Sequence, residues 1–290
     1  MDHKEIAEQI FLAGVESVLP ERLIVNKMEI KDNSLVIGQL TFHLNEIDKI
    51  YVIGAGKASA TMGAEVEKIL GSRITEGHIV VKYGHSCKLD YIKISEAGHP
   101  LPDSNGFKAT EQILKIAEKA TKNDLVICLL SGGGSSLLAD FPDGTSPEEM
   151  IKINNLLVNS GAVITEMNAV RKHLSKVKGG QLARVVYPAT LVNLILSDVP
   201  GDPLDVIASG PSVPDPTTFD QAISVLEKFK LTKSVSPGIL KYLKEGAASK
   251  REETPKQGDV VFENVYNLLI GNNLMALEAT KQKALEFNIN

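Results

Sequence analysis

The chain has 290 residues, of which 31 are basic and 36 acidic, so that its formal net charge is −5. This length accommodates one large domain or two modest ones, and a hydrophobic content of 43% is typical of a globular protein rather than a disordered one. The mild acidity argues against nucleic acid as a partner, two cysteines exclude a disulfide-rich scaffold, and no apolar run is long enough for a transmembrane helix.

The first ten residues are too charged for a signal peptide, which predicts a cytoplasmic protein. Residues 4–18 have the spacing of an amphipathic helix, and residues 20–48 alternate as short strands do. From residue 49 on, strands alternate with helices. The expected strands are 49–54, 77–82, 91–96, 124–130 and 190–196, and the expected helices are 57–70, 106–120, 147–160, one or two within 163–186, 217–230 and 236–247. This order predicts a doubly wound, Rossmann-like α/β domain over residues 1–246, with a mainly parallel sheet and helices on both faces.

Residues 247–262 are polar and interrupted by proline, which indicates a linker. A strand and a helix follow within residues 263–290. One strand and one helix cannot close a hydrophobic core by themselves. These residues therefore either dock on the main sheet or begin a second domain, and we expect the start of a truncated second α/β domain.

A glycine-rich loop, Ser131-Gly132-Gly133-Gly134-Ser135-Ser136, follows the apolar strand 124–130 and leads into a helix start. Glycine lets the backbone approach a ligand closely and adopt positive φ, and backbone N–H groups at a helix start favour an anion. Gly54 and Gly56 follow another strand in the same way, and strand 190–196 ends at Asp198. Parallel strands place such ends around one crevice. The alternative is a set of tight turns that bind no ligand.

Lys57 and Asp198 are the candidate catalytic residues. A cation is unfavourable at a helix N-terminus unless an anion lies nearby, so Lys57 is suited to a phosphate; otherwise it is a surface lysine. Asp198 either binds Mg²⁺ or accepts the proton of an attacking hydroxyl, unless it is only a turn carboxylate. The loop lacks the phosphate-binding pattern G-x-x-x-x-G-K-[ST]. Ser59 replaces the third glycine of a dinucleotide fingerprint, and no acid follows the next strand, which argues against a nicotinamide cofactor.

Further candidate ligand contacts come from a basic run and two constrained loops. On a helix, Arg171 and Lys178 share one face with Ser175, and arginine suits a carboxylate; the alternative is a solvated face. Prolines on its C-terminal side restrict the position of His99, which binds a ligand or belongs to a plain turn. Ser209 and Gly210 lie in another proline-containing loop that either lines the site or enters a helix.

Six segments together carry a family resemblance: Gly54–Ser59, Gly98–Asp103, Ser131–Ser136, Asn168–Gly180, Ser197–Asp202 and Ile207–Asp215. In this order and spacing they resemble the N-terminal part of the class II glycerate 2-kinase family, whose C-terminal portion is the MOFRL domain and whose members are often labelled hydroxypyruvate reductase. The resemblance implies ATP-dependent phosphorylation of D-glycerate to 2-phosphoglycerate, with ATP and Mg²⁺. It also implies that Lys57 lies at the active centre and that Arg171 and Lys178 bind anions.

The expected catalytic residues are thus Lys57 and Asp198, and Asp198 is also the expected metal ligand. The expected substrate and phosphate contacts are Gly54, Gly56, Ser59, His99, Ser131, Gly132, Gly133, Gly134, Ser135, Arg171, Lys178, Ser209 and Gly210. The family continues with a second domain that helps form the cleft, so we expect low activity of this chain alone and a partner chain with that domain, or a homo-oligomer. The alternatives are a non-catalytic module that binds a phosphorylated metabolite and an NAD(P)H-dependent hydroxypyruvate reductase.

Overall fold

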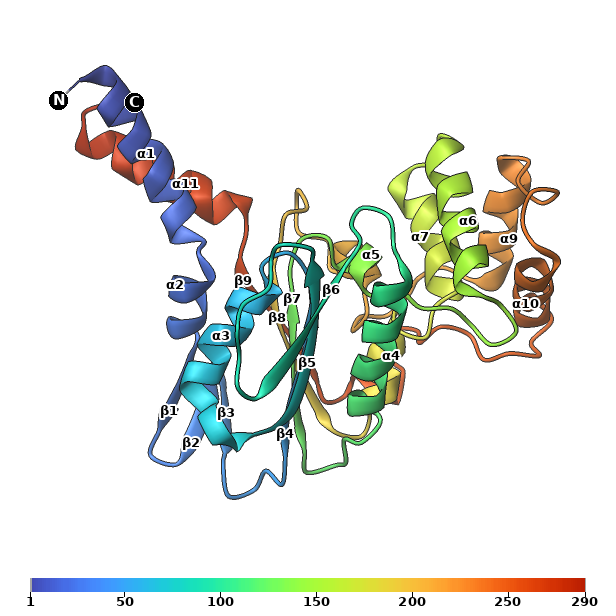
Figure 1. Cartoon of the computed structure of the whole chain (residues 1–290), viewed down its shortest axis with the longest axis horizontal. Helices are drawn as coiled ribbons and strands as arrows, with labels where there is room; N and C mark the ends of the chain where they lie inside the picture. Colours follow the sequence, from blue (N-terminus) through green and yellow to red (C-terminus); the bar gives the residue numbers. More distant parts are fainter. Residues whose placement is uncertain (1, 290) are drawn as a thin grey trace.

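A parallel six-stranded sheet forms the centre of the computed structural model, which describes residues 2–289 (Figure 1). Across the sheet the strands are β6 (Ile92–Ala97), β5 (Ile74–Lys82), β4 (Ile50–Ala55), β7 (Leu125–Leu130), β8 (Thr190–Leu196) and β9 (Val265–Gly271). Counted from β4, this is the strand order 3-2-1-4-5-6 of a doubly wound fold. The Rossmann-like α/β fold predicted from the sequence is therefore confirmed.

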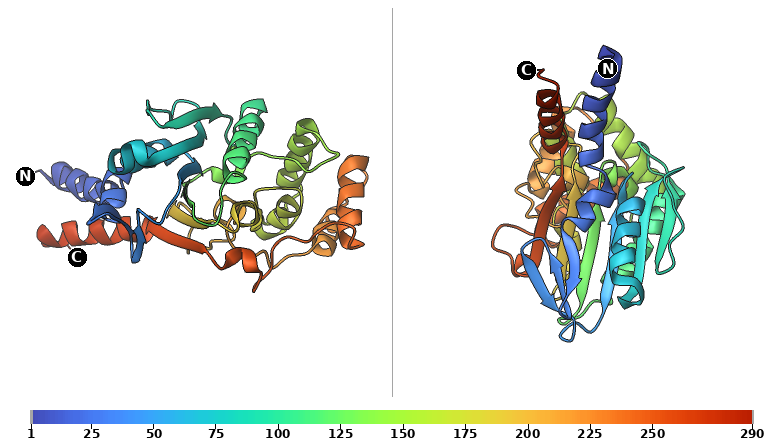
Figure 2. Two further views of the ribbon diagram at one scale, coloured as in Figure 1. Left: turned by 90° about the horizontal axis from the view of Figure 1, so that it is seen from below. Right: turned by 90° about the vertical axis from the view of Figure 1, so that its left-hand side faces the viewer.

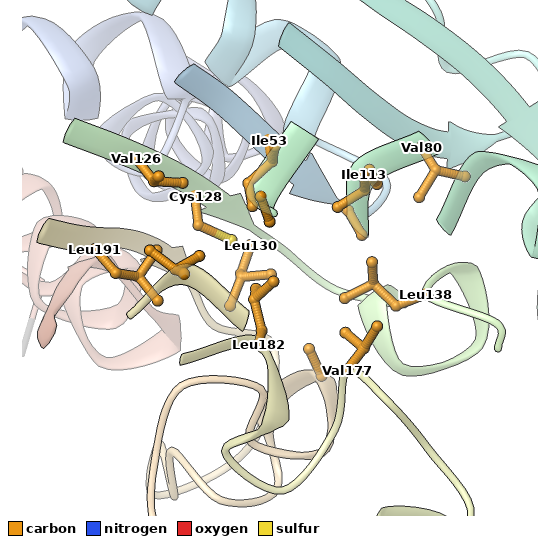
Figure 3. Close-up of a cluster of buried hydrophobic side chains, with 14 of the residues drawn as sticks. Ile53, Val80, Ile113, Val126, Cys128, Leu130, Leu138, Val177, Leu182 and Leu191 are labelled. Carbon is orange, nitrogen blue, oxygen red and sulfur yellow. The ribbon is translucent and has the colours of Figure 1, made fainter. Parts of the chain in front are cut away.

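Both faces of the sheet are covered, because side chains of successive strand residues point to opposite sides. Ile53 faces the core beneath α4 (Ser104–Ala117) and α8 (Gln181–Val186), where Ile113 and Leu182 are also buried (Figure 3). Val52 faces the second core. That side is covered by α2 (Pro20–Val25), α3 (Ser59–Leu70) and a small antiparallel sheet of β1 (Met28–Lys31), β2 (Ser34–Ile37) and β3 (Leu40–His43).

Four helices form a separate bundle beside the sheet, at the right of Figure 1. They are α6 (Pro147–Asn159), α7 (Ile164–His173), α9 (Phe219–Lys228) and α10 (Pro237–Ala247), and they share a third core of their own. Ser146, Thr218 and Ser236 cap the starts of α6, α9 and α10 by accepting a hydrogen bond from a backbone N–H. The sequence predicts these helices but not their assembly into a bundle.

The strand that follows residue 262 does not begin a second domain, contrary to the expectation from the sequence. β9 pairs in parallel with β8 and completes the main sheet. Residues 247–262 are not a free linker either, because Thr254 is buried and its hydroxyl donates to Asp215. The physical reason is that β8 offers an open edge, and pairing with β9 satisfies its backbone groups.

The two helices nearest the ends of the described chain lie side by side and project from the body (Figures 1 and 2). They are α1 (His3–Ser17) and α11 (Asn273–Glu286). Their approach is close at Gly14, where a Cβ atom would lie 2.2 Å from Thr280 Oγ1. Among residues 2–289, no helix has both the length and the apolar composition needed to cross a membrane.

Candidate active site

A cavity of about 540 Å³ lies between the carboxyl edge of the sheet and helices α6 and α7. It adjoins the place where β4 and β7 are neighbours and the strand order reverses, which is where open α/β sheets bind ligands. The loops that follow β6, β7 and β8 contribute to its wall. The predicted residues that line it are His99, Ser131, Gly132, Gly133, Gly134, Ser135, Arg171, Lys178 and Asp198.

Gly133 brings three parts of the predicted site together. Its φ of +89° places it in the left-handed region, just before the short helix α5 (Gly134–Leu137). A Cβ atom on Gly133 would lie 2.9 Å from His99 Nε2 and 3.5 Å from Lys57 Cε. The glycine loop, His99 and Lys57 therefore surround one point, and only glycine leaves room for this arrangement.

Lys57 does not itself line the cavity, but its Nζ lies 3.7 Å from Oδ2 of Asp198, which does. Their side chains are 40% and 59% exposed. Asp198 also lies against the glycine loop, because a Cβ atom on Gly132 would be 2.0 Å from Asp198 Oδ2. An ion pair this exposed contributes at most about 1 kcal/mol to stability. Both charges thus remain accessible to a ligand.

Arg171 supplies positive charge from α7. Its Nε donates a hydrogen bond of 2.8 Å to Asn154 Oδ1 on α6, and within residues 2–289 its guanidinium has no carboxylate partner. Burial lowers the pKa of Arg171, but a guanidinium stays charged in proteins. A partly buried cation without a counter-charge, facing a cavity, favours the binding of an anion.

Lys178 is different because its charge is already paired. Its Nζ donates to Leu138 O at 2.5 Å and to Asp140 Oδ1 at 3.3 Å. Burial lowers the pKa of Lys178, and the Asp140 carboxylate opposes that shift. Asp140 also accepts from Ser175 Oγ at 2.7 Å and from the backbone N–H of Lys176. This pair builds the wall of the cavity behind Arg171.

The expectation that Arg171, Ser175 and Lys178 share one helix face is wrong. Helix α7 ends at His173, and the chain turns through residues 174–180 before α8 begins. The Asp140 carboxylate holds this turn, since it binds Ser175, Lys176 and Lys178 together. Arg171 and Lys178 still reach the same cavity, but from different elements.

Some predicted ligand contacts instead pack two strand ends together. Ser59 Oγ and Ser131 Oγ lie 3.0 Å apart, and Ser59 Oγ also donates to Leu129 O. A Cβ atom on Gly54 would be 2.4 Å from Leu129 O, and Gly54, Gly56 and Ser59 do not line the cavity. Ser131 does line it, but its Oγ accepts from the backbone N–H of Ala58. The hydroxyls and glycines serve the contact between the loops after β4 and β7.

Replacing Gly56 by alanine tests this contact. Gly56 has φ +144°, and its Cβ would lie 2.1 Å from Ser131 Oγ, so we expect a loss of about 2–3 kcal/mol in unfolding free energy from the clash. Gly161→Ala is the matched control, because φ is +81° there, directly after the end of α6, but nothing lies within 4 Å, and about 1 kcal/mol is expected. Urea denaturation measures both. Equal losses for the two variants would contradict the close packing of the loops.

Ser209 and Gly210 also lie behind the cavity wall rather than in it. Ser209 is fully buried, and its Oγ lies 2.7 Å from Ser135 Oγ and donates to Asn168 Oδ1 at 3.2 Å. Gly210 O accepts from the backbone N–H of Gly180. Sequence analysis predicts that these two residues contact a ligand. In the structure their polar groups bind other parts of the chain and support the cavity wall.

His99 faces the cavity with its ring against the glycine loop. Burial, followed by the charges of Lys57 and Lys82, lowers the pKa of His99, so its ring is neutral at pH 7. The loop that carries it ends at Asp103, whose side chain caps α4 and accepts from Tyr83 Oη at 2.6 Å.

Ionic contacts with Asp215 and Glu253 fix the C-terminal end of α7. His173 Nε2 lies 2.8 Å from Glu253 Oε1, and the neighbouring Lys172 Nζ is 3.4 Å from Asp215 Oδ1. Burial acts to raise the pKa of Glu253, but hydrogen bonds from His173 and from the backbone N–H groups of Thr254 and Phe219 outweigh it and lower that pKa to about 2. Segment 250–256 is thereby fixed to the helix that presents Arg171.

These ionic contacts predict a specific pH dependence. The pKa of Glu253 is about 2 in the folded chain against a usual 4.5, so its ionised form stabilises the fold fully above about pH 4.5 and progressively less as the pH falls toward 2. Glu253→Gln should lower the melting temperature at neutral pH, and its difference from the wild type should shrink over that range. Glu252→Gln, at an exposed neighbour, is the control. A difference that stays constant with pH would refute the linkage.

Several residues of the site carried no recognised sequence signal. Asp140 and Asn154 anchor Lys178 and Arg171, yet each occurs in a segment without a motif. Met150, Asn154 and Val158 all line the cavity. Their spacing of four residues along α6 was the one available indication that they share a face.

Comparisons with known proteins show which proteins this chain is similar to. The model of the family described as "Domain of unknown function (DUF4147)" matches residues 6–244. A glycerate 2-kinase of Pyrococcus horikoshii is 38% identical over 98% of this chain and 63% of its own length, and a D-glycerate 2-kinase of Thermotoga maritima is 40% identical over 99% and 63%. The crystal structure of glycerate kinase from Thermotoga maritima superimposes with a TM-score of 0.83 at 39% identity and covers 99% of this chain and 63% of that one. The chain thus spans less than two thirds of these relatives, and nothing in the comparisons supports the expected partner chain.

Proposed function

Because the chain belongs to the class II glycerate kinase family, with its DUF4147 domain at residues 6–244, we propose that it acts in the ATP-dependent phosphorylation of D-glycerate to 2-phosphoglycerate. One observation carries the proposal. Asp198, the glycine loop and Arg171, which has no carboxylate partner within residues 2–289, line one cavity at the switch point of the sheet, and Lys57 pairs with Asp198. Phosphoryl transfer depends mainly on positioning and on neutralisation of charge, and these groups supply both.

Lys57 has the role of stabilising the transferred phosphoryl group. Its ammonium group lies next to Asp198, its Cε lies near the glycine loop, and its side chain is accessible. Positive charge at this point is worth more in the transition state, because charge spreads over the phosphoryl oxygens there. Arg171 holds a second anionic group deeper in the cavity, with Asn154 fixing its orientation.

Asp198 suits a magnesium ion. Mg²⁺ prefers oxygen ligands and is usually held by one or two carboxylates together with substrate phosphates and water. Asp198 lines the cavity and is more than half exposed, whereas Asp140 is already bound to Lys178. When bound, the ion would neutralise phosphate charge.

His99 then accepts the proton of the glycerate 2-hydroxyl. Its ring is neutral at pH 7 and faces the cavity against Gly133. Neutral imidazole nitrogen is an effective general base near this pH. The 2-hydroxyl oxygen forms a bond to the γ-phosphorus of ATP as the bond from that phosphorus to the bridging oxygen of ADP breaks. The hydroxyl proton moves to His99, and ADP leaves with the electron pair of the broken bond.

The test is to incubate the chain with ATP, Mg²⁺ and D-glycerate and to follow ADP release and the ³¹P spectrum of the product. We expect ADP formation that depends on D-glycerate, at a low rate from this chain alone, and a signal of 2-phosphoglycerate. Binding of glycerate and ADP by calorimetry without turnover would favour the non-catalytic module. Oxidation of NAD(P)H by hydroxypyruvate, with no ADP release, would favour the reductase.

A further inference from the structure

The cavity has a polar part and an apolar part, and the order of residues along α6 defines them. Met150, Asn154 and Val158 are spaced by four residues, so they share one face of α6, and all three line the cavity. Asn154 lies in the middle of this stripe and binds Arg171. Val158, one turn further toward the tip, is 57% exposed and has no polar group to offer.

Helix α7, the second helix of the α6–α7 hairpin, also carries a polar residue and, nearer the turn, an apolar residue on one face. Ile164 and Arg171 are seven residues apart, which is two turns, so they face the same side. Ile164 is 45% exposed and lines the cavity close to the α6–α7 turn. Along the helix axes, Val158 lies about 6 Å from Asn154 and Ile164 lies about 10 Å from Arg171, both toward the α6–α7 turn. We call this end of the hairpin, with Val158 and Ile164, the apolar tip.

The loop after β6 adds a further apolar residue to the cavity. Leu101 is 55% exposed and follows His99, whose ring packs on the glycine loop. The cavity of about 540 Å³ has the size of a pocket for a whole cofactor or drug-sized ligand. A three-carbon acid fills only a small part of it and has no apolar surface for Leu101, Val158 and Ile164.

We propose that this apolar part, formed by Leu101, Val158 and Ile164, binds the base and ribose of the nucleotide phosphoryl donor, whose phosphates extend toward Arg171. The inference rests on the proposed function and adds which part of the site holds the donor. A nucleotide has the required chemistry, because a flat base of low polarity is joined through a sugar to a strongly anionic chain. The separation of the apolar tip from Arg171 matches that construction.

The experiment compares two ligands that share the same phosphates. Calorimetry measures the dissociation constants of ADP and of inorganic diphosphate for the wild type, for the double variant Val158→Ser/Ile164→Ser and for Val163→Ser. Val163 is the matched control, because it lies in the same turn and is 59% exposed but does not line the cavity. All three positions are exposed, so the variants should fold as the wild type does.

We expect the double variant to bind ADP roughly tenfold or more weakly, because two apolar contacts are lost. Its binding of diphosphate should stay within about twofold of the wild type, and Val163→Ser should change neither. Equal ADP affinity of the double variant and the wild type would overturn the inference, as would a wild type that binds ADP no more tightly than diphosphate. A wild type that binds neither ligand would instead contradict the proposed function itself.

Discussion

Replacing Lys57 by alanine is expected to lower the rate of glycerate-dependent ADP formation by about 10²–10³-fold, because one preorganised charge at the transferred phosphoryl group is lost. The fold should be unaffected, since Lys57 is 40% exposed and its pairing with Asp198 at 3.7 Å contributes little stability. Steady-state kinetics measure the rate, and a melting curve measures the fold.

Lys82→Ala is the control for this experiment. Lys82 ends β5 at the same edge of the sheet, and it contributes to the electrostatic field at His99. It forms no ion pair with Asp198 within the described residues. We expect its removal to change the rate by less than about threefold, since screened charges act weakly at a distance. If the Lys57→Ala variant kept more than a tenth of the wild-type rate, Lys57 would not stabilise the transferred phosphoryl group.

Replacing Asp140 by alanine should produce the largest loss of stability, about 3–5 kcal/mol, because it leaves the buried ammonium of Lys178 without its counter-charge. The side chains of Lys178 and Asp140 are 9% and 7% exposed. Two further donors, from Ser175 and Lys176, lose their acceptor as well. Urea denaturation measures the change in unfolding free energy.

Two comparisons separate this effect from a general sensitivity of the region. Asp143→Ala removes an ion pair with Lys176, but Asp143 is 85% exposed, so we expect a loss below about 1 kcal/mol. The double variant Asp140→Ala/Lys178→Met should recover part of the stability, because it no longer buries an unpaired charge. If Asp140→Ala costs no more than Asp143→Ala, the buried pair does not support the wall of the cavity.

Much of the fold was predictable because each strand and helix carries its own periodic pattern. The apolar runs of β4 and β7 and the capped starts of α4 and α6 are local signals. The place of β9 was not predictable, since residues 250–256 look like a linker. Their polar side chains find partners in His173 and Asp215, which are far away in the sequence.

The site was predictable to the extent that its residues follow strands. Gly132, Gly133 and Asp198 come directly after β7 and β8, so the topology alone brings them together. A motif does not reveal which hydroxyls are free, and Ser59 and Ser131 bind one another. The contact of Asn154 with Arg171 depends on how α6 and α7 pack, which no local pattern specifies.

The pairing of α1 with α11 has a consequence for biosynthesis. Gly14 packs against Thr280, so α1 cannot pair with α11 until the ribosome has translated every element that lies between the two helices. Phe11 on α1 is 67% exposed even in the finished fold. During that interval α1 lacks the helix that covers part of its surface, and we expect the pairing of α1 with α11 to be one of the last steps of folding.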